Sequence, residues 1–236
     1  MTSASASRSR AHAEIAAAWH AIAGEGHDDV LADVLRRHAE AHRHYHTAEH
    51  VMSVVSHLDA LITDTLITDK TGADMTGEHI DRDALIAAAL FHDSIYEPRS
   101  ATNEASSADL ADVYLARIGW PATRRHTVAA LIRSTARHDG SGRADALLSD
   151  ADLAVLGADP DEYAEYVSAV RAEHADLPDD LWRAGRADVL RGFIGRPHVY
   201  KTATMLARRE QQARRNMQHE LDILVSAAQA PGSPAP

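Results

Sequence analysis

Apolar residues recur every three or four positions along most of the chain, and no stretch alternates steadily between apolar and polar residues. This spacing places apolar side chains on one face of an α-helix, whereas a half-buried strand would show a period of two. The pattern therefore predicts an all-α fold of about nine to ten helices. The expected helices cover residues 11–23, 28–43, 47–63, 81–93, 103–118, 121–137, 147–157, 160–175, 179–194 and 198–225.

Several boundaries between these helices are marked by residues with known positional preferences. Gly119 is expected to end one helix and Pro121 to begin the next, because glycine is favoured just past a helix end and proline in the first turn. Gly195 and Pro197 are expected to separate the last two helices in the same way. Residues 64–80 show no clear periodicity, and we predict a long loop there.

The two ends of the chain differ in composition from the helical interior. Residues 1–9 are mostly serine, alanine and arginine, and residues 226–236 are mostly alanine, proline and serine. Segments with so few large apolar side chains cannot bury enough surface to become ordered, so we predict disorder in both. The remaining residues, 10–225, are expected to form a single helical domain of generous size.

Charge and residue content narrow the classes of function. The net charge is −11, so the basic surface that binds nucleic-acid polymers is not expected. The absence of cysteine excludes disulfides, thiolate metal sites and cysteine nucleophiles. No apolar run reaches the roughly 18 residues of a membrane-spanning helix, and the first residues lack the apolar segment of a secretory signal. We therefore expect a cytoplasmic protein without a membrane partner.

Polar residues interrupt the apolar pattern in three clusters, and two of them contain histidine. His46 and His50 are four residues apart, so on a helix both imidazoles face the same side. His92 and Asp93 end the apolar run 87–91, which places both polar groups at or near the core. Burying them is costly unless a partner satisfies them, as a divalent cation would. On these residues alone, a structural or capping role explains the His-Asp pair equally well.

The third cluster places two aspartates at the start of the helix expected over residues 147–157. Asp152 shares its helix face with Leu148 and Leu156, where an acidic side chain needs a partner. At about 100° per residue, Asp150 points about 160° away from Asp152 and is suited to an N-terminal cap. Asp152 is therefore the preferred metal ligand, with Asp150 as the alternative.

Taken in order, these clusters resemble the His, His-Asp, Asp pattern of the HD superfamily of metal-dependent phosphohydrolases. They are most similar to an uncharacterised bacterial branch of predicted HD phosphohydrolases, which combines four short motifs. The motifs are here Tyr45-His46…His50, Ala88…His92-Asp93…Tyr96, Asn103-Glu104…Ser107 and Asp150-Ala151-Asp152-Leu153…Leu156-Gly157. The resemblance runs from about residue 43 to residue 220 and implies an HD-domain-like helical bundle with the site between helices. It does not indicate a particular substrate.

The resemblance implies one divalent metal ion, held by His50, His92, Asp93 and Asp152. Mixed nitrogen and oxygen ligation suits several metals, so Mn, Fe, Mg, Co, Ni and Zn remain open. The implied reaction is hydrolysis of a phosphoester or phosphoanhydride bond by a metal-activated water. Asp93 would also orient that water, and His46 would act as general acid to the leaving oxygen. The alternative for His46 is a hydrogen-bonded histidine beside the site.

Further contacts with a small phosphorylated substrate, such as a nucleotide, follow from the same resemblance. Arg43 is a candidate for binding a phosphate through two hydrogen bonds. His138 is a candidate ligand of a second metal ion, although a single ion is favoured. Some HD nucleotidases carry a glutamate three residues after the aspartate of the dyad, where this chain has Tyr96. Glu97 or Glu104 would then supply the carboxylate base, or the metal alone would activate water.

Three other functions remain open at this point. His46, Glu49 and His50 fit the His-x-x-Glu-His pattern of inverted-zincin metallopeptidases, in which both histidines bind zinc and the glutamate activates water. That interpretation leaves the other two clusters without a role. A di-iron oxygenase of the HD type would need additional histidine ligands, and a non-catalytic HD domain would bind a nucleotide without releasing phosphate. The oligomeric state is also open, and a homo-oligomer is compatible with the sequence.

Overall fold

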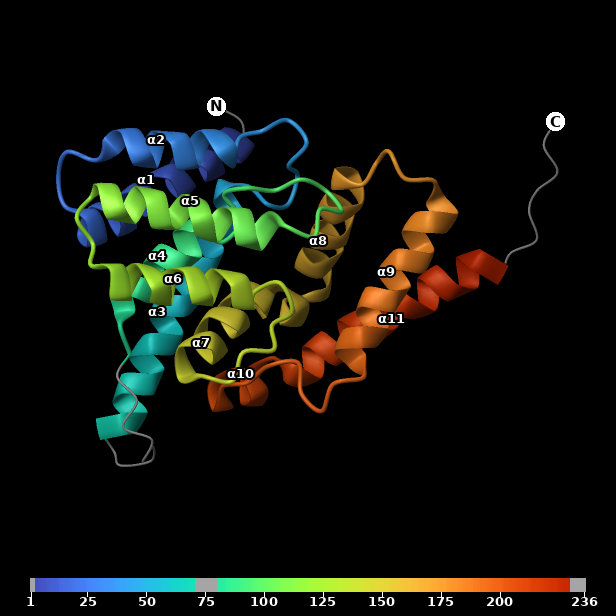
Figure 1. The fold of residues 1–236 in the computed structure, drawn as a ribbon. Helices are drawn as coiled ribbons and strands as arrows, with labels where there is room; N and C mark the ends of the chain where they lie inside the picture. Colours follow the sequence, from blue (N-terminus) through green and yellow to red (C-terminus); the bar gives the residue numbers. More distant parts are fainter. Residues whose placement is uncertain (1–2, 71–79, 230–236) are drawn as a thin grey trace. The chain divides into compact units, whose positions relative to one another are not determined.

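The computed structural model describes residues 3–70 and 80–229, and within these ranges every regular element is a helix (Figure 1). The predicted all-α class is confirmed, with eleven α-helices and one 3₁₀ helix in the described residues. The elements of the first part are α1 (Ser3–Ala23), α2 (Asp28–Arg37), α3 (Ala48–Lys70), α4 (Arg82–Phe91), α5 (Asn103–Arg117), α6 (Ala122–Ser134) and α7 (Arg143–Asp152). The remaining elements are η1 (Leu153–Gly157), α8 (Pro160–Glu173), α9 (Asp179–Ile194), α10 (Ala203–Arg208) and α11 (Glu210–Gln229).

Several boundaries differ from those predicted at the N-terminal end and around α3. Helix α1 begins at Ser3, inside the segment expected to be disordered, and α2 ends at Arg37 rather than near residue 43. Helix α3 continues to Lys70, so residues 64–70 are helical and not part of a loop. The rest of the expected loop, residues 71–79, lies outside the described residues, as do residues 230–236 of the expected tail.

The helix expected over residues 198–225 is two helices, α10 and α11, that meet at Arg209. The physical reason lies in the Glu210 carboxylate. It accepts hydrogen bonds from the backbone nitrogens of Val199 at 3.0 Å and Tyr200 at 3.2 Å, and from Arg214 at 2.7 Å. These contacts hold residues 198–202 in a non-helical turn beside the start of α11.

The predicted boundary between α5 and α6 is confirmed. Gly119 has φ of +84°, a left-handed conformation that glycine adopts without steric cost. The backbone nitrogens of Gly119 and Trp120 return to the carbonyls of Ala116 and Leu115, which closes the end of α5. Pro121 then stands directly before α6.

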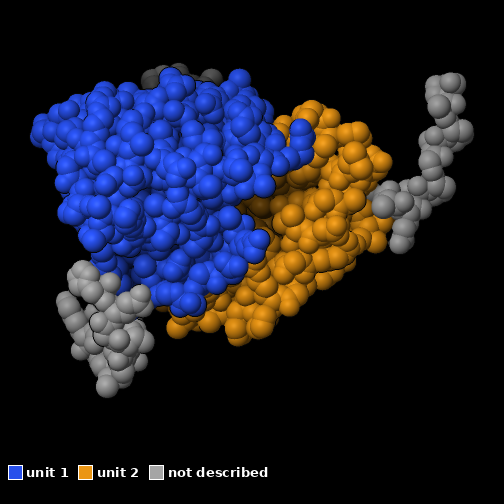
Figure 2. Space-filling view, viewed as in Figure 1, with its two compact units in different colours: residues 1–152 blue, residues 153–236 orange. Residues whose placement is uncertain are grey.

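The chain divides into two compact units, Met1–Asp152 and Leu153–Pro236, where the sequence predicted one domain over residues 10–225 (Figure 2). Each unit has its own buried apolar side chains and is described by itself. No helix in the described part of the chain is both long enough and apolar enough to cross a membrane.

Helix α4 forms the centre of the first unit. It contacts α1, α3, α5, α6 and α7, and every residue from Ala84 to Phe91 is buried. A helix that is apolar on all sides is stable only when other helices surround it, which accounts for its central position. Its start is fixed by Asp81, whose side chain accepts a hydrogen bond from the backbone nitrogen of Ala84 at 3.0 Å. The polar residues that follow Phe91 therefore emerge from the middle of the core.

In the second unit, α11 packs against α9, α10 and η1. Gly157, at the end of η1, explains the glycine in the fourth sequence motif. A Cβ atom at this position would lie 2.7 Å from the Cβ of Arg209 and 2.8 Å from the hydroxyl of Tyr200. Only glycine permits this close approach of the chain segments.

A buried ion pair crosses between α9 and α11. Arg186 donates two hydrogen bonds to Glu220, from Nε at 2.7 Å and from Nη2 at 3.0 Å. The hydroxyl of Tyr163 donates to the same carboxylate at 2.5 Å, and Arg186 also donates to the hydroxyl of Tyr166. The carboxylate and guanidinium thus complete each other's hydrogen bonds inside the second unit.

Candidate metal centre

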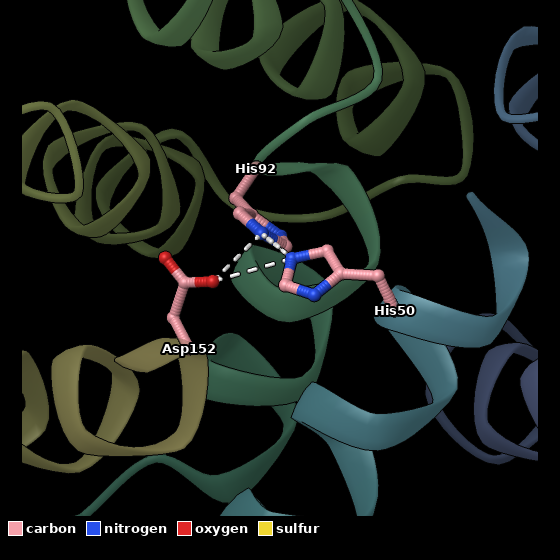
Figure 3. A group of neighbouring side chains, drawn as sticks. All are labelled: His50, His92 and Asp152. Carbon is pink, nitrogen blue, oxygen red and sulfur yellow. Dashed lines mark hydrogen bonds and ion pairs between the residues drawn. The ribbon is translucent and has the colours of Figure 1, made fainter. Parts of the chain in front are cut away.

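Three helix ends of the first unit bring two histidines and one aspartate together (Figure 3). His50 lies in the first turn of α3, His92 directly follows α4, and Asp152 is the last residue of α7. The helix predicted over residues 147–157 is in fact α7 followed by η1, so Asp152 stands at a helix end and not near a helix start. The imidazoles of His50 and His92 and one oxygen of Asp152 point toward a common centre (Figure 3).

The three potential ligand atoms all lie within 4.8 Å of one another. The Nε2 atoms of His50 and His92 are 3.2 Å apart. Asp152 Oδ1 is 3.2 Å from His50 Nε2 and 3.5 Å from His92 Nε2. Both imidazoles are almost completely buried, with side chains 4 % and 1 % exposed.

These separations match the edges of a coordination sphere. Ligand atoms about 2.1 Å from a shared ion, at angles of about 90–109° to each other, are separated by about 3.0–3.4 Å. The distances among His50, His92 and Asp152 run from 3.2 to 3.5 Å. The residues present therefore fit a divalent cation without large rearrangement.

Asp93 faces the same two imidazoles from a second side. Its Oδ2 is 3.1 Å from His92 Nε2 and 3.5 Å from His50 Nε2. Both aspartates thus have an oxygen within 3.5 Å of the same two imidazole nitrogens. In the described residues, the group whose ligand atoms all lie within 4.8 Å consists of His50, His92 and Asp152, and it does not include Asp93.

A backbone carbonyl fixes the protonation of His92. Its Nδ1 lies 2.8 Å from the carbonyl oxygen of Ala89, and a carbonyl can only accept, so Nδ1 carries the proton. In the neutral imidazole the lone pair is then on Nε2, the atom that faces His50 and both aspartates. A histidine ligand oriented by a hydrogen bond at its other nitrogen is the usual arrangement in metal sites.

The ionisable side chains of the centre strongly shift one another's pKa values. Burial by itself would lower the pKa of His50 and of His92, but Asp93 and Asp152 outweigh burial and raise both. Burial would raise the pKa of each aspartate, yet His92 above all holds the pKa of Asp93 and of Asp152 well below its usual range. Without a cation, this site therefore favours carboxylates beside protonated imidazoles.

His46 lies at the more open side of the centre. It precedes α3, so the helical spacing considered for His46 and His50 does not apply, and their ring centroids are nevertheless 5.7 Å apart. His46 Nε2 is 3.9 Å from Asp93 Oδ2. The ring stacks on Tyr96 with centroids 4.1 Å apart, and the backbone oxygen of Tyr96 is 2.9 Å from His42 Nε2.

Arg43 connects the segments that carry these residues. Its Nη1 donates to the carbonyl of Asp93 at 2.7 Å and to that of His46 at 3.2 Å, and its Nη2 donates to the carbonyl of Ser94 at 3.3 Å. Nε pairs with Glu40 at 3.1 Å. The side chain is completely buried, so the guanidinium serves to position the backbone rather than to bind a phosphate as the sequence suggested.

Asn103 and Ser107 hold the loop that follows the His-Asp pair, a role that the sequence did not reveal. Asn103 exchanges two hydrogen bonds with the backbone of Glu97, at 3.0 and 2.9 Å. Ser107 Oγ accepts from the backbone nitrogen of Ile95 at 3.0 Å and donates to its carbonyl at 3.2 Å. The spacing of four residues at the start of α5 was the available signal, because it places both side chains on one face.

His138 and Asp150 occupy different surroundings. His138 has φ of +50°, which is uncommon for a residue other than glycine, and its Nε2 lies 3.7 Å from Asp152 Oδ2. It therefore faces the aspartate of the centre from outside the three-residue group. Asp150 is completely buried within the last turn of α7, so the proposed N-terminal cap is wrong for this residue.

The glutamates considered as bases lie elsewhere. The Glu97 side chain is exposed, and Asn103 hydrogen-bonds to the backbone of Glu97. Glu104 is partly exposed in the first turn of α5. Glu49 approaches Arg8 at 4.0 Å and lines a separate cavity. None of the three belongs to the described group of ligand atoms within 4.8 Å.

The centre combines two neutral-nitrogen donors with carboxylate oxygens, a ligand set that suits Mn, Fe, Co, Ni and Zn. The sequence matches no family model, and no curated protein or solved structure shows significant similarity to it. Function is therefore inferred from the chemistry of this site.

Proposed function

We propose that the chain is a metal-dependent phosphohydrolase of the HD type. The observation that carries this proposal is the convergence of His50, His92 and Asp152, from three helix ends, with ligand atoms within 4.8 Å of one another. Asp93 adds a second carboxylate beside both imidazoles. The order along the chain, His, then His-Asp, then Asp, is the order of the HD pattern.

A divalent cation bound here would supply the positive charge that activates a water molecule and stabilises the charge developing on a phosphoryl group. The residues of the chain would hold the metal ligands and the attacking water in position. The carbonyl of Ala89 holds His92 with Nε2 toward the centre. Asp93, whose side chain is 14 % exposed, is suited to orient the attacking water, because it lies between the buried imidazoles and His46.

His46 is suited to donate a proton to the leaving oxygen. Its side chain is 21 % exposed, whereas those of His50 and His92 are nearly inaccessible, so a substrate reaches His46 more easily. Stacking on Tyr96 limits the rotation of the ring. A donor held in a fixed orientation beside the reacting bond is what general-acid catalysis requires.

The substrate class is a small phosphorylated compound, such as a nucleotide. The net charge of −11 disfavours a polyanion that would contact much of the surface. A small phosphate differs, because a bound divalent cation reverses the local charge at the centre. The bond cleaved would be a phosphoester or a phosphoanhydride.

The metallopeptidase alternative is disfavoured by the position of Glu49. In that mechanism Glu49 would activate water beside His46 and His50. Its carboxylate instead approaches Arg8 and lines a cavity whose lining includes neither histidine. A second ion, as a di-iron oxygenase needs, would have to recruit His138, which lies 3.7 Å from Asp152 Oδ2.

The proposal is tested by removing metal from the purified chain with a chelator and adding back single metals, with Mn²⁺ first. Phosphate release is then followed over nucleoside monophosphates, nucleoside triphosphates, cyclic dinucleotides and a simple aryl phosphate. We expect release that depends on the added ion. The His46→Gln variant should retain the ion and lose most of its turnover, because only the proton donor is removed.

A histidine outside the site provides the control. His20 is about half exposed and pairs with Asp28 at 2.7 Å, so His20→Gln removes an imidazole without touching the centre. Its turnover should equal that of the unchanged protein. A chain that binds the ion stoichiometrically but releases no phosphate from any substrate in the panel would overturn the hydrolase proposal, and oxygen-dependent turnover with two irons would favour the oxygenase.

A further inference from the structure

His138 lies where the chain leaves α6. The helix ends at Ser134, and the turn formed by residues 135–138 closes with a hydrogen bond from the backbone nitrogen of His138 to the carbonyl of Ser134 at 3.0 Å. The φ angle of His138 is +50°, in the left-handed region that glycine or asparagine usually adopts after a helix. At the end of α5 it is Gly119 that adopts this conformation, with φ of +84°. The backbone alone would therefore favour glycine at residue 138 as well.

The contacts of the imidazole give a reason for a histidine at this position. Residues other than glycine that are held in a left-handed conformation cost free energy, and they occur preferentially at functional sites. The side chain of His138 is only 13 % exposed, and its Nε2 lies 3.7 Å from Oδ2 of Asp152. The unusual backbone conformation thus accompanies a largely buried ring that faces an aspartate of the candidate metal centre.

The two oxygens of Asp152 have different surroundings. Oδ1 is 3.2 Å from His50 Nε2 and 3.5 Å from His92 Nε2, whereas the other oxygen points away from both imidazoles (Figure 3). Oδ1 is therefore the atom suited to bind the ion, and Oδ2 is the outer oxygen that His138 faces. Carboxylates that bind metals are commonly held by hydrogen bonds from neighbouring groups, and these bonds fix their orientation.

The chemistry of the pair assigns the donor and the acceptor. An ionised carboxylate can only accept, so a hydrogen bond between the two side chains requires the proton on Nε2 of His138. The separation of 3.7 Å is longer than the roughly 3 Å of an N–H···O hydrogen bond. Hydrogen bonds in a site without its ligand are often long and tighten when the ligand binds. A small rotation of either side chain is enough to close this gap.

We propose that His138 is a positioning residue for Asp152: its Nε2–H binds Oδ2 and thereby keeps Oδ1 directed toward the ion. A place behind the ligand, rather than among the ligands, is supported by the group of ligand atoms within 4.8 Å of one another, which in the described residues does not include His138. The inference rests on the candidate metal centre, and it does not depend on the reaction that the centre catalyses.

The test compares two substitutions of similar size that differ in a hydrogen-bond donor. In His138→Gln the amide nitrogen replaces Nε2 as the donor, whereas His138→Leu fills the space without one. Neither residue is glycine or β-branched, so the backbone conformation affects both variants alike. Mn²⁺ binding to the full chain is measured by calorimetry. We expect His138→Leu to lose about 10–100-fold in affinity, and His138→Gln to recover most of that loss.

The Co²⁺-loaded protein provides a second readout, because the visible absorption of Co²⁺ changes with the number and arrangement of its ligands. Without the donor on Oδ2, Asp152 is free to bind through both oxygens. The spectrum of His138→Leu should therefore change, and that of His138→Gln should not. His126→Leu replaces an exposed histidine of α6 and serves as the control, with the affinity and the spectrum of the unchanged chain.

The outcomes separate this inference from the proposed function. Equal affinities of His138→Leu and the unchanged chain, or equal losses in His138→Leu and His138→Gln, would overturn it. Two ions per unchanged chain and one in His138→Leu would also overturn it, because His138 would then be a ligand itself. A chain that binds no metal would overturn the centre and the inference together. The expected affinities in a chain that releases no phosphate would support the inference and overturn only the hydrolase proposal.

Discussion

Each unit contains a buried polar cluster, and the two clusters differ in whether their own side chains satisfy each other's hydrogen bonds and charges. In the second unit, Arg186 donates two hydrogen bonds to Glu220, the hydroxyl of Tyr163 donates to the same carboxylate, and Arg186 also donates to the hydroxyl of Tyr166. Donors there meet acceptors of opposite charge. Burial and the neighbouring carboxylate raise the pKa of Tyr163, which keeps its proton in place for this bond.

The cluster of the first unit has the opposite character. His50 and His92 direct the same atom, Nε2, toward each other at 3.2 Å, and oxygens of Asp93 and Asp152 lie 3.1 and 3.2 Å from these nitrogens. With neutral imidazoles, the atoms that face each other are all hydrogen-bond acceptors. Such a group is stable only if protons or a cation lie between these atoms. A cluster whose donors and acceptors satisfy each other indicates a structural role. A cluster whose acceptors face one another indicates a site that binds a ligand.

The largest expected effect comes from removing a ligand of the centre. His92→Ala should abolish measurable binding of Mn²⁺ or Zn²⁺ in calorimetry, because substitutions that only touch a ligand's partners already cost about 10–100-fold in affinity. The helical circular dichroism spectrum should be retained. His57→Ala on α3 is the control, since its ring hydrogen-bonds to Ser53 on its own helix. Unchanged affinity of His92→Ala for the metal ion would contradict the assignment of this cluster as a metal centre.

The second effect concerns stability and not metal binding. Arg186→Met leaves Glu220 buried and without its cation, so the free energy of unfolding should fall by about 3–5 kcal/mol. Denaturant titration of the metal-free protein measures it. Arg191→Met removes an exposed pair with Asp188 and should cost at most about 1 kcal/mol. Equal losses in the two variants would mean that the buried cluster of Arg186 and Glu220 does not stabilise the fold.

A smaller effect is expected at Arg43, which joins the backbone segments of the centre. Lysine keeps the charge but lacks the fork of donors that reaches three carbonyls, so Arg43→Lys should weaken metal affinity by about 10–100-fold. Arg37→Lys, at the partly buried pair with Asp33 on α2, is the matched control. If Arg43→Lys binds the ion as tightly as the control, the positioning role is wrong.

The smallest effect is a dependence on pH. In the metal-free protein the pKa values of His50 and His92 are raised, so their stabilising contribution is complete below about pH 6.5 and is lost as the pH rises through the raised values. The pKa of Asp93 is lowered, so its contribution is present above about pH 4 and is lost only in stronger acid. Metal binding requires deprotonated ligands.

The melting temperature difference between metal-loaded and metal-free protein should therefore increase from pH 6 to pH 8.5. Differential scanning fluorimetry at matched ionic strength measures it. His92→Ala serves as the control, because it removes the ion from the comparison and should show no such increase. A difference that shrinks with rising pH would contradict the assignment of the centre.

The helical class and several boundaries could be predicted because they depend on local spacing and on residues such as Gly119 and Pro121. The break after Arg37 could not, because no glycine or proline marks it, and it is the contacts of Arg43 with residues 46, 93 and 94 that stabilise it. The division of the last helix at Arg209 likewise depends on Glu210 binding a distant backbone.

The candidate ligands could be predicted because histidine and aspartate at core positions are costly without a partner. The functions of their neighbours could not. Arg43 near a phosphate site suggests a substrate contact, and only the fold shows that its guanidinium is completely buried. Asn103 and Ser107 have partners in the loop at residues 95–97, which no periodicity reveals.

The central claim is that His50, His92 and Asp152 share one divalent cation. The most direct measurement is an anomalous difference map from crystals of the full chain grown with Mn²⁺. We predict one peak per chain, about 2.0–2.2 Å from His50 Nε2, His92 Nε2 and Asp152 Oδ1. A map with no peak at these three atoms, or with the manganese bound only elsewhere, would contradict the account.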